Sequence, residues 1–189
     1  MYLEDMKIYI ITTSHLEELM FKSMFDDCPN VEVVKNDFES FMKKNPDVEC
    51  IVSPANCYGI MDGGYDAAIS NYLGWDFQRK VQKYIIDNFY GEQIVGTSFI
   101  IDCPYNKKLI HTPTMIMPEK VIDNRIVYTA MRSTLICALK NNIKSIVIPL
   151  FGAGTGKVGI DIVCKHMRNA YEQIYNAENG YYGFYDEFE

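Results

Sequence analysis

The chain has 189 residues, 48% of them hydrophobic, and a formal net charge of −7. This length and apolar content suffice for one domain with a sizeable core, and no stretch has the composition of a linker. The negative charge argues against a broad nucleic-acid surface, which requires clustered Lys and Arg side chains, so any phosphate must be bound locally.

Strand and helix patterns alternate along the first half of the chain. Short runs rich in β-branched residues predict strands at residues 7–12, 31–34 and 50–53. Periodic apolar residues predict helices at residues 15–24, 38–44, 66–73 and 77–89. The first helix follows Ser14, which opens a capping box of the S-x-x-E form with Glu17, and Pro54 ends the third strand.

The second half continues the alternation. Strands are predicted at residues 97–102, 109–112 and 146–150, and the last is apolar throughout, as is typical of a strand covered on both faces. A helix capped by Asp123 or Asn124 ends near Asn141. The final helix carries one apolar stripe, formed by Val163, Met167, Ala170 and Ile174. Buried strands alternating with helices predict α/β layers.

Cysteine usage and the N-terminal sequence indicate a compartment. The six cysteines form no C-x-x-C pair, so buried reduced thiols are expected rather than disulfides or a zinc site. The N-terminus MYLEDMK has acidic residues where a signal peptide has its cationic region, and the apolar runs are only strand-sized. We therefore expect a soluble cytoplasmic protein. The aromatic and acidic residues 181–189 form either a docked or frayed end or a partner site.

The sequence FGAGTGKVG, residues 151–159, directly follows the predicted strand that ends at Leu150. A P-loop requires Gly where Phe151 stands and Ser or Thr where Val158 stands. A dinucleotide-binding turn requires a further strand, for which too little chain remains. What remains is a flexible loop between a buried strand and a helix, which can bind a phosphate through its backbone N–H groups.

A second glycine-containing loop, VSPANCYGIMDGGYDAAI, begins in the predicted strand 50–53 and enters the helix that starts near Asp66. Ligands of open α/β sheets lie beyond the carboxyl ends of the strands, so we expect the two loops to face one another. Backbone N–H groups at a helix N-terminus bind an anion without any basic side chain. The two loops together predict a pyrophosphate site in an acidic protein.

In these loops the chain resembles the macro domain family, whose members bind ADP-ribose and in some branches hydrolyse ADP-ribosyl bonds. The resemblance covers roughly residues 31–175 and rests on three stretches: residues 52–69, residues 148–154 and Asn36-Asp37-Phe38-Glu39. It implies a three-layer α/β/α sandwich with a mixed central sheet, in a single domain over residues 1–189 whose core spans about 7–176 and whose tail is 177–189.

The resemblance also implies site residues. The ligand-binding set comprises Asp37, Phe38, Ser53, Ala55, Gly63, Gly64, Tyr65, Phe151, Gly152, Ala153, Gly154, Thr155 and Gly156. Asp37 accepts a hydrogen bond from the adenine amine, or else caps the helix that begins near Phe38. Asn56 holds the hydroxyls of the distal ribose, or else stabilises the turn after Pro54.

Asp66 decides between an enzyme and a non-catalytic reader. In the hydrolysing branch an acid at this spacing activates or orients a water near the distal ribose, which makes Asn56 and Asp66 the predicted catalytic pair. The alternative is that Asp66 caps the helix and complements its dipole. The departures Ser53, Asp62 and Tyr65 from the family pattern count against activity more than against binding.

Three other side chains have a weaker claim to a role at the site. Lys157 either reaches a phosphate or is a solvated surface lysine. Cys57, next to Asn56, is a possible thiol beside the ligand, but nothing in the sequence lowers its pKa. His111 lies in an apolar strand and is expected to be a buried side chain.

These residues predict a protein that binds ADP-ribose or an ADP-ribosylated substrate. The expected reaction is hydrolysis of ADP-ribosyl esters, either on acidic side chains or in O-acyl-ADP-ribose, without a metal or another cofactor. The alternative is a module that senses or sequesters such nucleotides without cleaving them. Neither a broad nucleic-acid surface nor a membrane partner is expected.

Overall fold

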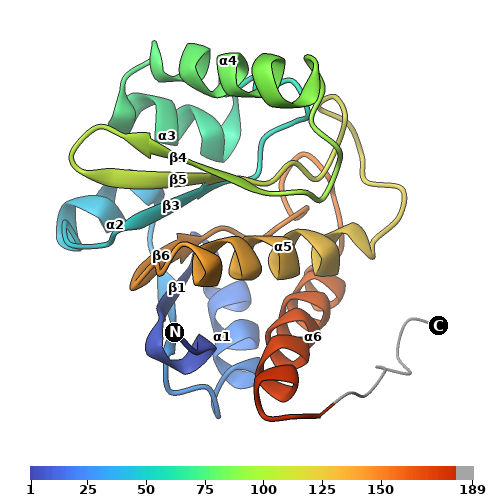
Figure 1. The fold of residues 1–189 in the computed structure, drawn as a ribbon. Coiled ribbons are helices and arrows are strands. Elements are labelled where there is room, and N and C mark those ends of the chain that lie inside the picture. Colours follow the sequence, from blue (N-terminus) through green and yellow to red (C-terminus); the bar gives the residue numbers. More distant parts are fainter. Residues whose placement is uncertain (182–189) are drawn as a thin grey trace.

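The computed structural model describes residues 1–181 and has three layers, with helices on both faces of a six-stranded sheet (Figure 1). The strand order is β2-β1-β6-β3-β5-β4. All neighbouring strands are parallel except β4, which runs antiparallel to β5 at the edge of the sheet. The predicted three-layer α/β/α fold with a mixed sheet is confirmed.

The strands are β1 (Lys7–Thr12), β2 (Val31–Lys35), β3 (Cys50–Ser53), β4 (Phe99–Cys103), β5 (Lys107–His111) and β6 (Ser145–Ile148). The helices are α1 (His15–Met24), α2 (Phe38–Lys44), α3 (Gly64–Leu73), α4 (Phe77–Phe89), α5 (Ile126–Lys140) and α6 (Ile160–Glu178), and a 3-10 turn η1 covers Leu3–Asp5. Helix α2 has the predicted bounds, whereas β4 begins two residues later than predicted.

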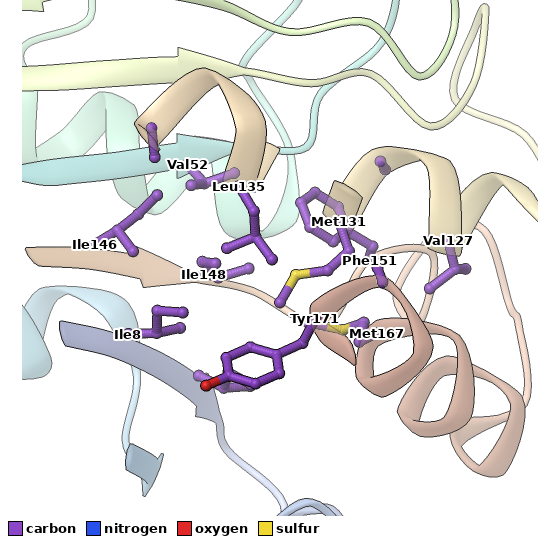
Figure 2. Packing of buried hydrophobic residues seen from close by; sticks show 14 of the residues in the cluster. Ile8, Val52, Val127, Met131, Leu135, Ile146, Ile148, Phe151, Met167 and Tyr171 are labelled. Carbon is purple, nitrogen blue, oxygen red and sulfur yellow. The ribbon is translucent and has the colours of Figure 1, made fainter. Parts of the chain in front are cut away.

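Alternate residues of the central strands pack into two cores, because successive side chains of a strand point to opposite faces. Ile8 and Ile146 pack against the helices α1, α5 and α6 on one face of the sheet, together with Phe151 and Met167 (Figure 2). The core on this face is called the lower core. Val147 faces the other core, which α2, α3 and α4 cover. A strand buried on both faces must be apolar throughout, as residues 146–148 are.

Two helix starts differ from the sequence expectation. The N-cap position of α5 is Arg125, which makes no side-chain capping bond, so the helix starts later than a cap at Asp123 or Asn124 predicts. The Asp123 carboxylate instead accepts hydrogen bonds from the backbone N–H and the guanidinium of Arg125. Ser14 does cap α1, but the Glu17 carboxylate accepts from Thr12 rather than from Ser14, so only half of the capping box forms.

Further observations bear on the cysteines and the chain end. All six cysteines are free, and five are buried. Over residues 1–181, no helix is long and apolar enough to span a membrane. The predicted tail function rests mainly on residues 182–189, which lie outside the described part of the chain.

Candidate functional site

A cleft lies beyond the carboxyl ends of β1, β3 and β6, where the strand order changes direction. It consists of two adjoining cavities of about 220 and 380 Å³. The two cavities share four residues, namely Tyr65, Pro149, Leu150 and Gly154. Both glycine loops line the smaller cavity, so the expectation that they face one another agrees with the geometry.

The loop after β3 presents free backbone donors to the smaller cavity. Helix α3 begins at Gly64 with Gly63 as its N-cap residue, and both line this cavity together with Tyr65. Within residues 1–181 the N–H groups of these three residues donate no hydrogen bond, as expected for a first helical turn without a capping side chain. The positive end of the α3 dipole therefore lies at the wall of the smaller cavity.

The loop after β6 is held by apolar packing underneath it. Phe151 is fully buried in the lower core and lines neither cavity, so its predicted place in the ligand-binding set is wrong (Figure 2). Gly152 has φ 74°, and a Cβ there would lie 3.1 and 3.3 Å from methyl groups of Val158 and Val127. Both the backbone angle and the close packing therefore favour glycine at this position.

The same loop offers N–H donors to the cleft, though fewer than predicted. The Ala153 N–H already donates to Leu150 O at 3.3 Å. Those of Gly154, Thr155 and Gly156 donate to no group in the described part of the chain. The Gly152 N–H also donates to no described group, so four amides of the second loop, those of Gly152, Gly154, Thr155 and Gly156, are free donors that line the smaller cavity.

No Lys, Arg or His side chain lines either cavity, as far as residues 1–181 are concerned. Lys157 is exposed and belongs to neither cavity wall, as the surface-lysine reading predicts. Asp62 lines the smaller cavity beside Gly63, so the local charge is negative. An anion bound here depends on backbone dipoles.

Asp66 is buried in the wall of the smaller cavity, with 9% of its surface exposed. The hydroxyl of the fully buried Ser53 donates to Asp66 Oδ1 at 2.6 Å. Burial raises the pKa of this carboxyl to about 7, against a smaller lowering effect of the Ser53 hydrogen bond. A carboxyl with this pKa exchanges a proton near neutral pH, as a general base does.

This geometry corrects two sequence expectations. Gly63, not Asp66, occupies the N-cap position of α3, so the predicted capping role of Asp66 is wrong. Ser53 lines neither cavity, so it is not a ligand contact and instead orients the Asp66 carboxyl from strand β3.

Asn56 is buried at the start of the loop and organises it. Its side-chain oxygen accepts from the N–H groups of Tyr58 and Ile60, at 3.1 and 3.3 Å, and its amide donates to Ile60 O at 3.1 Å. The turn-stabilising reading is therefore realised. Asn56 also lines the smaller cavity with Ala55, and its side-chain amide has a second N–H group beyond the one that donates to Ile60 O.

The larger cavity contains Asp37, Phe38 and the side of Tyr65. Asp37 caps α2, because its Oδ1 accepts from the Ser40 N–H at 2.8 Å, which also lowers its pKa. The rings of Phe38 and Tyr65 meet edge to face, with centroids 5.3 Å apart. The buried Tyr65 hydroxyl has no hydrogen-bond partner among the described residues. An aromatic wall with a nearby carboxylate suits a flat base with an amino group.

Several lining residues were not predicted. Thr12, Thr13 and Glu17 line the larger cavity, and their position after β1 was the signal that could have revealed them. Thr114, Met115 and Pro118 line the smaller cavity and carry no motif.

Two other groups are chemically quiet. Burial raises the pKa of Cys57 to about 11, and its thiol donates to Met115 O, so it is not a reactive thiolate. His111 is fully buried beside Gln93, and burial lowers its pKa to about 3. Among the described residues no group of acidic, His or Cys side chains has the arrangement of a metal site.

Comparison with known sequences gives a family. The macro domain family model matches residues 52–167, which include both glycine loops. An uncharacterized protein of Aquifex aeolicus (strain VF5) is 32% identical over 122 residues, which cover 64% of this chain and 71% of that protein.

Solved structures show the same fold. The macrodomain of Mycobacterium tuberculosis DarG has a TM-score of 0.58 at 21% identity, covering 67% of this chain and 83% of its own. The Oceanobacillus iheyensis macrodomain with ADP has a TM-score of 0.58 at 19% identity, covering 67% and 68%. A mutant of the latter with ADPR gives a TM-score of 0.58 at 19% identity, covering 67% and 70%.

Proposed function

The chain belongs to the macro domain family, and from that premise we propose that it binds ADP-ribose or an ADP-ribosylated substrate and hydrolyses ADP-ribosyl esters. The observation that carries the proposal is a single cleft in which two glycine loops offer free N–H groups beside a buried carboxyl of raised pKa. The macrodomain structures with ADP and with ADPR support the ligand class.

In this proposal the ligand spans both cavities. The adenine occupies the 380 Å³ cavity, with its amino group near the carboxylate of Asp37 and its ring beside Phe38. The diphosphate lies between Gly63–Tyr65 and Gly154–Gly156, where the free amides replace its hydration without a cationic side chain. The distal ribose then lies in the smaller cavity, near Asn56 and Asp66.

Hydrolysis requires a base at the distal ribose, and we assign this role to Asp66. Its Oδ1 is held by Ser53, which leaves Oδ2 to accept a proton from a water in the smaller cavity. The water oxygen bonds to the anomeric carbon of the distal ribose, the bond between that carbon and the ester oxygen breaks, and the proton passes from Asp66 to the solvent or to the leaving carboxylate. A pKa of about 7 leaves a large fraction of Asp66 ionised at neutral pH.

The second candidate function is a non-catalytic reader of ADP-ribose. It is favoured by Asn56, whose side chain is already used inside its own loop, and by Asp62, which adds a negative charge to the cavity wall. A reader binds ADP-ribose with the same loops and releases none from a modified acceptor.

Two measurements on the same protein separate these functions. Calorimetry with ADP-ribose tests binding, and release of ADP-ribose from a mono-ADP-ribosylated acidic peptide tests hydrolysis. The Asp66→Asn variant keeps an acceptor for Ser53, and we expect it to lose turnover with ADP-ribose affinity within about tenfold, or about 1.4 kcal/mol.

Asp47→Asn is the control for the loss of a carboxylate, because Asp47 is exposed and lines neither cavity. It should retain turnover. Undiminished turnover in Asp66→Asn would remove Asp66 from the mechanism, and absence of binding to ADP-ribose would remove the ligand assignment itself.

A further inference from the structure

A third cavity, of about 640 Å³, is lined mainly by residues of the segment 112–125, which joins β5 to α5, and by residues of α5 itself. This volume is within the range of small-molecule sites, about 300–1,000 Å³. Its lining is mainly apolar and includes Val95, Met115, Ile116, Val121, Ile122 and Ile126. No role described above uses this cavity.

The third cavity meets the cleft at its distal end. Thr114 and Met115 line both the third cavity and the 220 Å³ cavity that contains Asp66, whereas the 380 Å³ cavity shares no lining residue with it. The third cavity therefore adjoins the cavity proposed for the distal ribose and not the one proposed for the adenine.

The segment 112–125, which contributes to the walls of both the third cavity and the cleft, is hydrogen-bonded to both glycine loops. The Cys57 N–H donates to the carbonyls of Met115 and Ile116, at 3.1 and 3.3 Å. The Val121 N–H donates to Gly156 O at 3.0 Å. The segment is thus held by main-chain bonds, and the third cavity has a defined position relative to the cleft.

The chemistry of the walls selects an uncharged apolar group. Ile122 is 96% exposed and Ile116 is 45% exposed, so apolar surface remains to be covered. Asp123 and Arg125 neutralise one another by a pair of hydrogen bonds. The remaining charged residues of the lining, Glu119 and Lys120, have opposite signs. A phosphate or an acidic side chain finds no net charge here to attract it.

We propose that this cavity binds the acyl chain of an ester between a carboxylic acid and the distal ribose, with a chain longer than an acetyl group. The inference rests on the proposed function and specifies its substrate class as longer-chain O-acyl esters of ADP-ribose. Hydrolysis consumes one water, breaks the ester C–O bond and gives ADP-ribose and the free carboxylic acid, with no change of oxidation state.

The test compares acetyl and octanoyl esters of ADP-ribose as substrates of the full chain. We expect kcat/KM for the octanoyl ester to exceed that for the acetyl ester at least tenfold, because its additional CH2 groups leave water for an apolar wall. Equal values, or a preference for the acetyl ester, would overturn the proposal while leaving the proposed hydrolase intact. A faster reaction only with apolar peptide acceptors would also overturn it.

A variant assigns the preference to the cavity. Ile122→Asp is expected to reduce the octanoyl-to-acetyl ratio to below about threefold while leaving acetyl-ester turnover unchanged, and its exposed position makes misfolding unexpected. Ile86→Asp, on the exposed face of α4 at 61% exposure, is the matched control and should keep the ratio. An unchanged ratio in Ile122→Asp would contradict the assignment.

Binding provides a second readout if no ester is cleaved. Calorimetry of both esters with Asp66→Asn should give at least tenfold tighter binding of the octanoyl ester, and equal affinities would overturn the inference. If neither the esters nor ADP-ribose bind, the proposed function fails as well.

Discussion

Burial of Asp66 makes the stability of the fold depend on pH. A carboxyl whose pKa is raised by folding holds its proton more tightly in the folded state, so its contribution is fully present below the unfolded pKa and is lost as the pH rises through the folded pKa. For Asp66 this interval runs from about 3.8 to about 7. Within it, rising pH lowers the free energy of unfolding.

The magnitude follows from the shift. Each pKa unit corresponds to about 1.4 kcal/mol, so a rise from 3.8 to about 7 gives an upper limit of about 4 kcal/mol. Asp66→Asn removes this contribution and still accepts from Ser53. The difference in the free energy of unfolding between the variant and the parent should therefore increase by up to about 4 kcal/mol, in favour of the variant, as the pH rises from 4 to 8.

Urea unfolding at several pH values measures the difference at each pH, in which the contributions of other carboxyls cancel. Asp62→Asn serves as the control, because an exposed substitution should stay within about 0.5 kcal/mol of the parent at each pH. A stability difference between Asp66→Asn and the parent that does not change with pH would refute the reasoning.

Three further predictions concern the walls of the cleft. Ser53→Ala removes a hydrogen bond that lowers the pKa of Asp66, so the acidic limb of the pH–rate profile should move to higher pH. An acidic limb that does not move would exclude a role of Ser53 in positioning the Asp66 carboxyl. Tyr65→Phe removes a buried hydroxyl that has no hydrogen-bond partner in residues 1–181, so thermal unfolding should show a fold that is more stable by up to about 1 kcal/mol. If the ligand accepts a hydrogen bond from this hydroxyl, calorimetry should show weaker ADP-ribose binding by the same variant. Gly156→Ala should lower the free energy of unfolding in urea by about 1–3 kcal/mol, because the new Cβ would lie 2.7 Å from Gly152 O. Gly154→Ala has open space around its Cβ, so this variant should mainly weaken ligand binding.

Local patterns were sufficient to predict much of the fold and the framework of the cleft. The apolar run at residues 146–148 and the helix α2 were recognisable because periodicity and capping are encoded within a few neighbouring residues. The two glycine loops were predicted to meet because each follows a parallel strand, and the carboxyl ends of such strands lie at one edge of the sheet.

The orientation of individual side chains was less accessible from the sequence. Asp66 reads as a helix cap by its position, yet its carboxyl turns towards Ser53 on β3, a contact that depends on how α3 packs on the sheet. Met115 enters the cleft wall through a bridge to Asn56, and pairing between segments so far apart leaves no local pattern. Phe151 lies within the glycine-rich stretch, but its side chain packs in the lower core and does not reach the cleft.

Burial of Asp66 serves both parts of the proposed function. A diphosphate bound by backbone amides alone is repelled by any ionised carboxylate in the same small cavity, and Asp62 already supplies one such charge. With a pKa of about 7, Asp66 is partly protonated at neutral pH, which reduces this repulsion when the ligand enters. The bound anion in turn raises the pKa of Asp66 further, because a like charge disfavours ionisation. Ligand affinity and the strength of the base are therefore linked through one proton, and the Ser53 hydroxyl, which favours the ionised form, sets the balance between them.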